Sequence, residues 1–202
     1  MRRLIATLLC LVALGARAQD NDLLKRVLAE LGAHSSVRAE FTQSRENPAL
    51  SQAQISQGQL VFVAGHGLLW QVSEPYRETL ALTGSRTARI DDQGHLLVVR
   101  GGDRGVAQVS QMLQSMLAGN PDDALRQFDV EPKGTATQWT LRFTPRQQRM
   151  ANVLRAIELN GDQFLQGIRI EMQSGETTNI RFSRTRDAGD LSPLELRALG
   201  MP

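Results

Sequence analysis

Two short apolar runs separated by glycines form the most regular hydrophobic pattern of the chain, between residues 58 and 76. The runs cover residues 60–64 and 68–72, and a Gly-His-Gly sequence between them supplies the turn expected of a β-hairpin. Successive side chains of a strand point to opposite faces. The residues predicted to share the apolar face are Leu60, Phe62, Ala64, Leu68, Trp70 and Val72. The other face is mixed, so a sheet of such strands is expected to keep one face dry and one face in water.

The sequence on either side of this hairpin changes from a helical to a strand pattern. Apolar residues recur at helical spacing between residues 23 and 31, and Gly32 stands where this helix is expected to end. After Ser35 the period becomes two, which predicts a strand before the hairpin. Short apolar runs around Gly94 predict a second hairpin after it.

The second half opens with two helical segments and then returns to strands. Residues 106–117 place apolar side chains on one helical face, and Asn120-Pro121 begins a second, shorter helix. Five strand patterns follow, with Asn160-Gly161 as the clearest hairpin signal. The tail after Asp187 is expected to be irregular, apart from a short helix that begins near Ser192.

These patterns predict the fold class. The helices do not alternate regularly with the strands, which argues against the βαβ crossovers of a parallel sheet. An antiparallel sheet of about 10–11 strands rarely stays flat and open, so it is expected to curl. The prediction is a mainly β fold with α (α+β): an incomplete antiparallel β-barrel, with helices forming a lid over the hydrophobic concave face.

The N-terminus has the three parts of a secretory signal peptide. Two arginines precede an apolar run over residues 4–14, and Ala16-Arg17-Ala18 forms a cleavage site of small residues. Cleavage is expected after Ala18, which leaves residues 19–202 as a single exported domain, predicted to be periplasmic.

Cleavage also changes the charge of the chain. Removing residues 1–18 removes three arginines and no acid, so the formal net charge falls from +2 to −1. The precursor pI of about 9.2 is therefore no argument for a nucleic-acid partner. Cys10 leaves with the signal peptide, so the mature protein is expected to be stable without disulfides.

Candidate catalytic residues are sparse. His34, His66 and His95 are scattered along the sequence, and only His95, near Asp91, could be a base with an orienting partner. The sequence from Asp91 to Gly94 is more simply a turn. The glycine clusters lack the spacing of phosphate-binding loops. We therefore predict no enzyme activity, no metal and no cofactor.

The apolar stripe of the 106–117 helix allows two interpretations. Methionine side chains adapt to irregular partners, so Met112 and Met116 could belong to a movable lid over an apolar interior. They could equally be ordinary core residues. The lid hypothesis places Val109, Met112, Leu113, Met116 and Leu117 on the lid.

Short motifs along nearly the whole mature chain resemble those of the LolA outer-membrane lipoprotein carrier family. In chain order they are Phe41-Thr42-Gln43, Gly58-x-Leu60, Leu68-x-Trp70, Pro75, Trp139-x-Leu141, Gly167-Ile168 and Ile180-x-Phe182. The resemblance implies a half-barrel that ferries lipid-modified proteins through the periplasm without breaking bonds. It also implies an inner-membrane ABC release complex and an outer-membrane acceptor as partners. We expect a monomer.

The resemblance and the strand pattern together assign the site. The lipid-binding cavity is predicted to be lined by Phe41, Leu60, Phe62, Leu68, Trp70, Leu80, Leu82, Leu141, Ile168 and Ile180. The family carries an arginine followed by proline in the hairpin, which holds the lid closed, whereas this chain has Ala64-Gly65. The latch is therefore missing, or is supplied by Arg86, Arg89 or Arg100.

Two functional alternatives remain open. The chain could be a module that senses lipoproteins or lipids, as the RseB regulators with a LolA-like domain do. It could also carry a lipid other than a lipoprotein in an envelope lipid pathway.

Overall fold

The computed structural model describes residues 22–202, except for residues 85, 92, 100–111, 113 and 117–121. Eleven strands form one sheet within this part of the chain. They are β1 (Ser36–Glu46), β2 (Gln54–Val63), β3 (Gly67–Glu74), β4 (Glu78–Thr83), β5 (Arg86–Ile90), β6 (Leu96–Val98), β7 (Phe128–Thr135), β8 (Gln138–Pro145), β9 (Leu154–Gly161), β10 (Leu165–Met172) and β11 (Thr177–Asp187).

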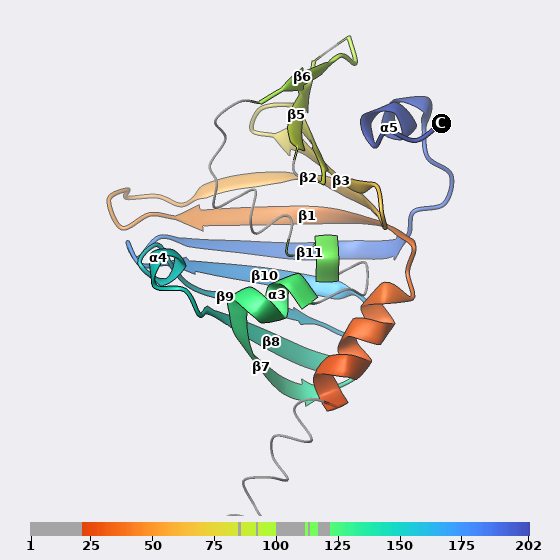
Figure 1. Cartoon of the computed structure of the whole chain (residues 1–202). Helices are drawn as coiled ribbons and strands as arrows, with labels where there is room; N and C mark the ends of the chain where they lie inside the picture. The colour runs from red at the N-terminus through yellow and green to blue at the C-terminus, as the bar shows by residue number, and fades with distance from the viewer. Residues whose placement is uncertain (1–21, 85, 92, 100–111, 113, 117–121) are drawn as a thin grey trace, which may run out of the picture.

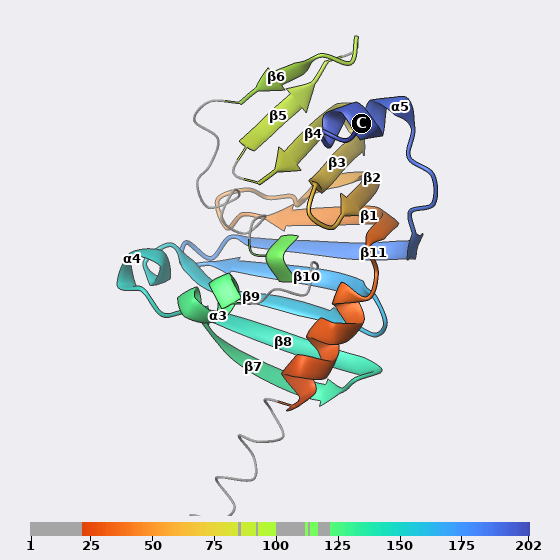
Figure 2. The same ribbon diagram turned by 45° about the vertical axis from the view of Figure 1, so that its right-hand side comes forward.

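The strand order is β6-β5-β4-β3-β2-β1-β11-β10-β9-β8-β7, with every neighbouring pair antiparallel. Each half of the chain folds as a meander, and β1 joins the halves by pairing with β11, where Phe41 lies opposite Phe182. The sheet curves strongly, yet β6 and β7 stay at its two edges (Figures 1 and 2). The prediction of an incomplete antiparallel barrel of about 10–11 strands is confirmed.

Helices lie on the enclosed face of the second half of the sheet. The helix of residues 22–32 and α3 (Asp122–Gln127) lie in front of β7 to β10, with the helical residues 112 and 114–116 close by (Figure 1). The apolar face of the first helix joins the main hydrophobic core, where Val27 is fully buried. Burial of this face, more than intrinsic propensity, stabilises so short a helix. No helix in the described residues is long and apolar enough to cross a membrane.

One helix was not predicted. α4 (Gln148–Ala151) connects β8 to β9 and lies at one end of the sheet (Figure 1). It is a single turn without buried residues or a side-chain cap. So short a helix has no amphipathic period, which explains why the sequence gives no signal for it.

The outer face of the first half is dry near one end of the sheet, where the alternation predicts a wet face, whereas Gln57 and Gln59 farther along β2 are exposed as predicted. Val61, Val63 and Leu69 point away from the enclosed side and pack in a second core with Ala198 and Leu199. The cover is α5 (Pro193–Ala198), which lies beside β3 and β5 (Figure 1). The C-terminal tail is therefore part of the folded domain.

A buried ion pair fixes α5 to the sheet. Arg38 of β1 donates two hydrogen bonds to Glu195, at 2.7 and 3.2 Å, and the Glu195 side chain is only 8% exposed. Ser192 and Glu195 also form a capping box at the start of the helix. Burial raises the pKa of Glu195, but the hydrogen bonds from Arg38 and Ser192 outweigh this effect and hold the pKa below its ordinary value.

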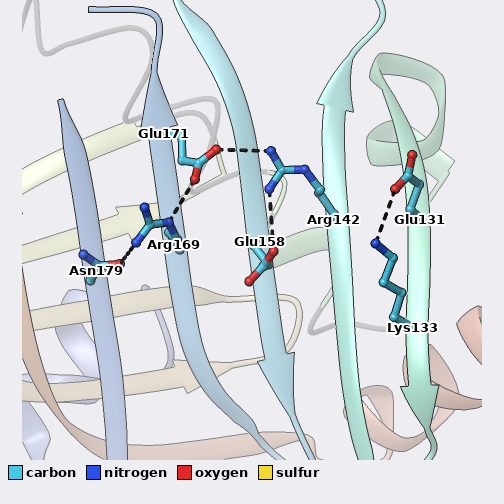
Figure 3. Close-up of polar contacts among 7 residues, drawn as sticks. All are labelled: Glu131, Lys133, Arg142, Glu158, Arg169, Glu171 and Asn179. Atoms are coloured by element: carbon cyan, nitrogen blue, oxygen red, sulfur yellow. Dashed lines mark hydrogen bonds and ion pairs between the residues drawn. The ribbon is translucent and has the colours of Figure 1, made fainter. Parts of the chain in front are cut away.

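The outer face of the second half is polar. Arg142 bridges Glu158 and Glu171, and Arg169 bridges Glu171 and Asn179, so four neighbouring strands are linked across this face (Figure 3). The hydrogen bond from Arg169 lowers the pKa of Glu171, against the effect of its partial burial, and Arg142 lowers it further. This face is therefore the wet outer face that the alternation predicts.

Candidate functional site

A large apolar cavity lies along the enclosed face of the sheet. Its volume is about 1480 Å³, whereas small-ligand pockets usually hold about 300–1,000 Å³. Many of its lining residues come from β2, β3 and β4 and from β10 and β11. These two groups of strands lie on opposite sides of β1 in the sheet (Figure 2). The cavity is therefore large enough for a ligand longer than a typical small metabolite.

Eight of the ten residues predicted to line a cavity do line this one. They are Leu60, Phe62, Leu68, Trp70, Leu80, Leu82, Ile168 and Ile180. They come from five strands: β2, β3 and β4 lie on one side of β1, and β10 and β11 lie on the other. Every second residue of each strand points inward. The hydrophobic alternation of the sequence thus identifies apolar wall residues on both sides of β1.

Phe41 and Leu141 are on the enclosed face but lie behind the wall. The Phe41 ring stacks on the indole of Trp70 with a centroid distance of 3.7 Å, so Trp70 separates it from the cavity. Leu141 is fully buried in the main core. Strand alternation assigns the face of a residue, but whether the residue meets the cavity depends on what covers it.

Aromatic contacts position Trp70 in the wall. Trp70 stacks on Phe41 and makes an edge-to-face contact with Phe182, with a centroid distance of 6.4 Å. Such pairs contribute about 0.5–1.5 kcal/mol beyond their buried area. Phe41 and Phe182 therefore hold the indole against the sheet and leave its free side toward the cavity.

The predicted lid residues are only partly within the described chain. Met112 and Met116 are helical and buried in the main core, at 5% and 1% exposure, and Gln114 between them lines the cavity. Val109, Leu113 and Leu117 lie outside the described residues. The helix therefore contacts both the core and the cavity, as either interpretation of its apolar stripe requires.

The cavity is closed at one end and open at the other. At the closed end, Leu31, His34 and Phe164 line it, and none of the three is exposed. At the other end, beside α4, the lining includes Tyr76 and Val153, which are 82% and 56% exposed. Tyr76 and Val153 lie near each other because the end of β3 and the start of β9 are at the same end of the antiparallel sheet.

His34 brings a polar group to the closed end, a role that the sequence does not predict. Its Nδ1 lies 2.9 Å from Oδ1 of Asp187, and its ring packs against Phe164 at a centroid distance of 4.2 Å. Its Nε2 is buried and has no hydrogen-bond partner in the described part of the chain, and the same is true of the Gln114 side-chain nitrogen. Because both residues line the cavity, they could bond to polar atoms of a ligand.

The charged residues of the lining are grouped at the open end. Arg45 pairs with Glu176 at 2.5 Å, and Arg89 pairs with Glu78 at 2.7 Å. Arg77 and Arg149 also line the cavity and are exposed, but neither has an ion pair with any described residue. These two arginines therefore carry uncompensated charge.

The latch position has no arginine substitute among the described candidates. The backbone N–H of Ala64 donates to the Ser35 carbonyl at 2.8 Å, and its side chain packs at the edge of the core. Arg89 pairs with Glu78 on the neighbouring strand, and Arg86 is exposed at the start of β5. Arg100 lies outside the described residues. What holds the lid stays a prediction to be tested.

The Asp91–His95 pair has the geometry of a turn. Asp91 Oδ1 accepts hydrogen bonds from the backbone N–H groups of Gln93 and His95, and Oδ2 lies 3.1 Å from His95 Nδ1. The backbone N–H of His95 contributes most to a pKa of Asp91 below its ordinary value. Both the hydrogen bonds and the pKa fit a carboxylate that stabilises the chain reversal before β6.

The sheet and the cavity together define a half-barrel with an apolar interior that opens at one end. The chain belongs to the LolA family: the family described as outer membrane lipoprotein carrier protein LolA matches residues 33–194. The resemblance seen in the sequence is therefore confirmed. The family is one of carriers and not of enzymes, in agreement with the prediction that the chain is no enzyme.

Several solved structures are similar to the chain at low sequence identity. A DUF1329 family protein from Desulfovibrio piger has a TM-score of 0.50 at 11% identity, covering 91% of this chain and 98% of that one. A LolA superfamily protein from Nitrosomonas europaea has a TM-score of 0.49 at 10% identity, covering 86% and 94%. MucB in the MucA/MucB complex of Pseudomonas aeruginosa has a TM-score of 0.46 at 15% identity, covering 87% and 59%. No curated protein sequence matches the chain.

Proposed function

We propose that this protein carries the acyl chains of lipoproteins, or of related lipids, in its cavity and moves them from the inner to the outer membrane. The observation that carries the proposal is an apolar cavity of about 1480 Å³ that is closed at one end and open at the other. Each buried methylene contributes about 0.8 kcal/mol. A chain of several methylenes is thus held firmly without any specific polar contact.

The wall is suited to flexible chains more than to one rigid ligand. Aliphatic side chains such as Leu80 and Ile180 alternate along the strands, and the indole of Trp70 offers a flat apolar surface. Met112 and Met116 at the helix above can repack as a lid when the contents change. The eight lining residues are therefore proposed as the lipid-binding site.

The proposal includes a cellular location and binding partners. A signal peptide over residues 1–18, cleaved after Ala18, would deliver the protein to the periplasm. There it would act as a monomer that receives its cargo from an inner-membrane ABC complex and passes it to an outer-membrane acceptor. N-terminal sequencing of the exported protein tests the cleavage site, because a first residue other than Gln19 contradicts it.

Native mass spectrometry of protein purified without detergent tests the function directly. We expect a population whose excess mass equals one or more acylated molecules, released when the protein is denatured. Leu68→Glu, which puts a charge beside Phe62 and Leu82, should remove this population while the circular dichroism spectrum is kept. Protein that carries no lipid even when expressed with an abundant lipoprotein would contradict the proposal.

The same spectrum decides between two kinds of cargo. Ala64, which replaces the arginine of the family pattern, favours a cargo that differs from that of a typical LolA protein. An excess mass of a few hundred daltons would indicate a free lipid, whereas one of several thousand would indicate a lipoprotein.

A further inference from the structure

The open end of the cavity combines exposed apolar and basic residues on both of its sides. Tyr76 and Arg77 lie in the loop between β3 and β4, and Arg149 and Val153 belong to α4 and the turn after it. All four line the cavity and all four are exposed. We call these four residues the rim.

We infer that the rim is a docking surface for a lipid bilayer that contains anionic lipids. The inference adds a membrane-binding surface to the proposed function. It rests on the proposed function, because a lipid carrier has a reason to contact a bilayer. A carrier that collects acyl chains at one membrane and delivers them at another works beside a bilayer, and a cavity mouth that rests on the bilayer keeps the methylenes out of water during transfer. The rim residues are those that would touch the bilayer first.

The two sides of the rim come from opposite halves of the sheet. The β3–β4 loop belongs to the first meander and α4 to the second, with β1 and β11 between them. A flat surface that contacts both sides therefore covers the opening. This geometry allows a chain to pass between bilayer and cavity without exposure to water.

The side chains of the rim match the chemistry of a membrane surface. Tyrosine is enriched at the level of lipid headgroups, where its ring is buried and its hydroxyl stays wet. Arginine can extend an apolar stem along the surface and hold its charge among phosphates. Tyr76 is 82% exposed and Val153 is 56% exposed, so no described part of the chain buries either side chain.

The charges of the rim favour an anionic surface. Two acids of the cavity lining have a cationic partner, since Glu176 pairs with Arg45 and Glu78 pairs with Arg89. The third acid, Asp91, accepts hydrogen bonds within its own turn. Arg77 and Arg149 are the arginines of the lining that form no ion pair with a described residue. Two exposed acids, Glu46 and Glu74, lie at the same end of the sheet but do not line the cavity.

Other exposed apolar residues support the same orientation. Leu50 at the tip of the β1–β2 hairpin and Ile55 near it are 51% and 57% exposed, and both lie at the open end. At the closed end the lining residues are covered, as the burial of Leu31 shows. A docked molecule would therefore present its open end, and not its closed end, to the bilayer.

Vesicle flotation tests the inference with the full mature chain. The probes are vesicles of phosphatidylcholine alone and of phosphatidylcholine mixed with phosphatidylglycerol. We expect the protein to float with the mixed vesicles, less so at high salt, and not with the neutral ones. Arg77→Gln with Arg149→Gln should weaken the partition about thirty-fold, since each arginine near an anionic surface adds about fivefold. Tyr76→Ser with Val153→Ser should also weaken it.

A matched control removes two other exposed arginines. Arg86 begins β5 at the far end of that strand, and Arg181 lies on β11, and neither has an ion pair with a described residue. Arg86→Gln with Arg181→Gln should float as the wild type does. The inference would be overturned if this control lost as much flotation as the rim variant, or if the protein floated equally with neutral and anionic vesicles. It would also be overturned if the rim bound a protein partner and no vesicle.

Lipid uptake from detergent micelles separates this inference from the proposed function. The rim variants should still take up lipid in native mass spectrometry, because the rim lines only the exposed mouth of the cavity and includes none of the eight residues proposed as the lipid-binding site. A protein that binds lipid but floats with neither vesicle would refute the docking surface alone. A protein that floats but never holds lipid would refute the carrier function alone.

Discussion

Replacing Ile180 by glutamate would put a carboxylate in the middle of the cavity wall. Ile180 lies on β11 between Gln43 and Ile168 of the neighbouring strands, and it is only partly buried. The carboxylate can stay hydrated while the cavity is empty, so we expect the variant to fold. An apolar ligand that covers the position must either remove water from the carboxylate or leave it protonated.

Protonation sets an upper limit on the loss of binding free energy. Protonating a glutamate of ordinary pKa at about pH 7 costs about 3.7 kcal/mol, because each pKa unit corresponds to about 1.36 kcal/mol. A protonated carboxyl group without a hydrogen-bond partner adds about 1 kcal/mol. The dissociation constant of an uncharged apolar ligand should therefore rise by up to about 3,000-fold.

Fluorescence titration with the uncharged dye Nile red measures this loss. Ile180→Gln should lose about 1–3 kcal/mol at every pH, because a buried amide lacks a partner but carries no charge. The glutamate variant should regain affinity about tenfold per unit as the pH falls from about 7 to about 5. Ser183→Glu, with the same charge on the outer face of β11, should bind as the wild type.

Two results would refute this reasoning. The first is wild-type affinity in Ile180→Glu, which would mean that bound ligand does not cover this part of the wall. The second is an equal and pH-independent loss in the glutamate and glutamine variants, which would mean that the substitutions disturb the sheet and not the ligand contact.

Three further predictions concern the fold that holds the cavity. Arg38→Met should lower the free energy of unfolding by about 3 kcal/mol, since it leaves Glu195 buried without its partner; chemical denaturation measures this, and a change below about 0.5 kcal/mol would contradict it. Folding lowers the pKa of Glu195, so its carboxylate stabilises the fold fully at pH values above its ordinary pKa of 4.5. This stabilisation is lost as the pH falls toward the folded pKa. The Tm values of wild type and Glu195→Gln should therefore converge as the pH is lowered. Gly58→Ala should cost about 1–3 kcal/mol, since its Cβ would lie 1.9 Å from the Gln71 carbonyl oxygen, whereas Ser56→Ala on the same face should leave Tm nearly unchanged.

Much of the fold follows from short-range pattern alone. The alternation of residues 58–76 identifies both the hairpin and its enclosed face, and the structure pairs Leu60 with Trp70 as that pattern requires. The glycine turn at residues 65–67 and the Ser192 cap are likewise local. These features are predictable because period-two alternation and turn chemistry act between residues close in sequence.

The sequence pattern does not predict which segments bury each face of the sheet. Val61 and Leu69 look like the second face of a half-wet hairpin, yet α5 buries them. The contact depends on Arg38 meeting Glu195, 157 residues later in the chain. Nothing near either residue in the sequence indicates such a partner.

The sequence by itself determined the strands, their enclosed faces and eight apolar residues of the cavity wall, because each depends on side chains that alternate along one strand. The tertiary structure alone decided that β1 pairs with β11, that Trp70 shields Phe41, and that the cavity opens beside α4. These outcomes depend on segments brought together from distant parts of the chain. Their contacts depend on packing in three dimensions, which a one-dimensional period does not record.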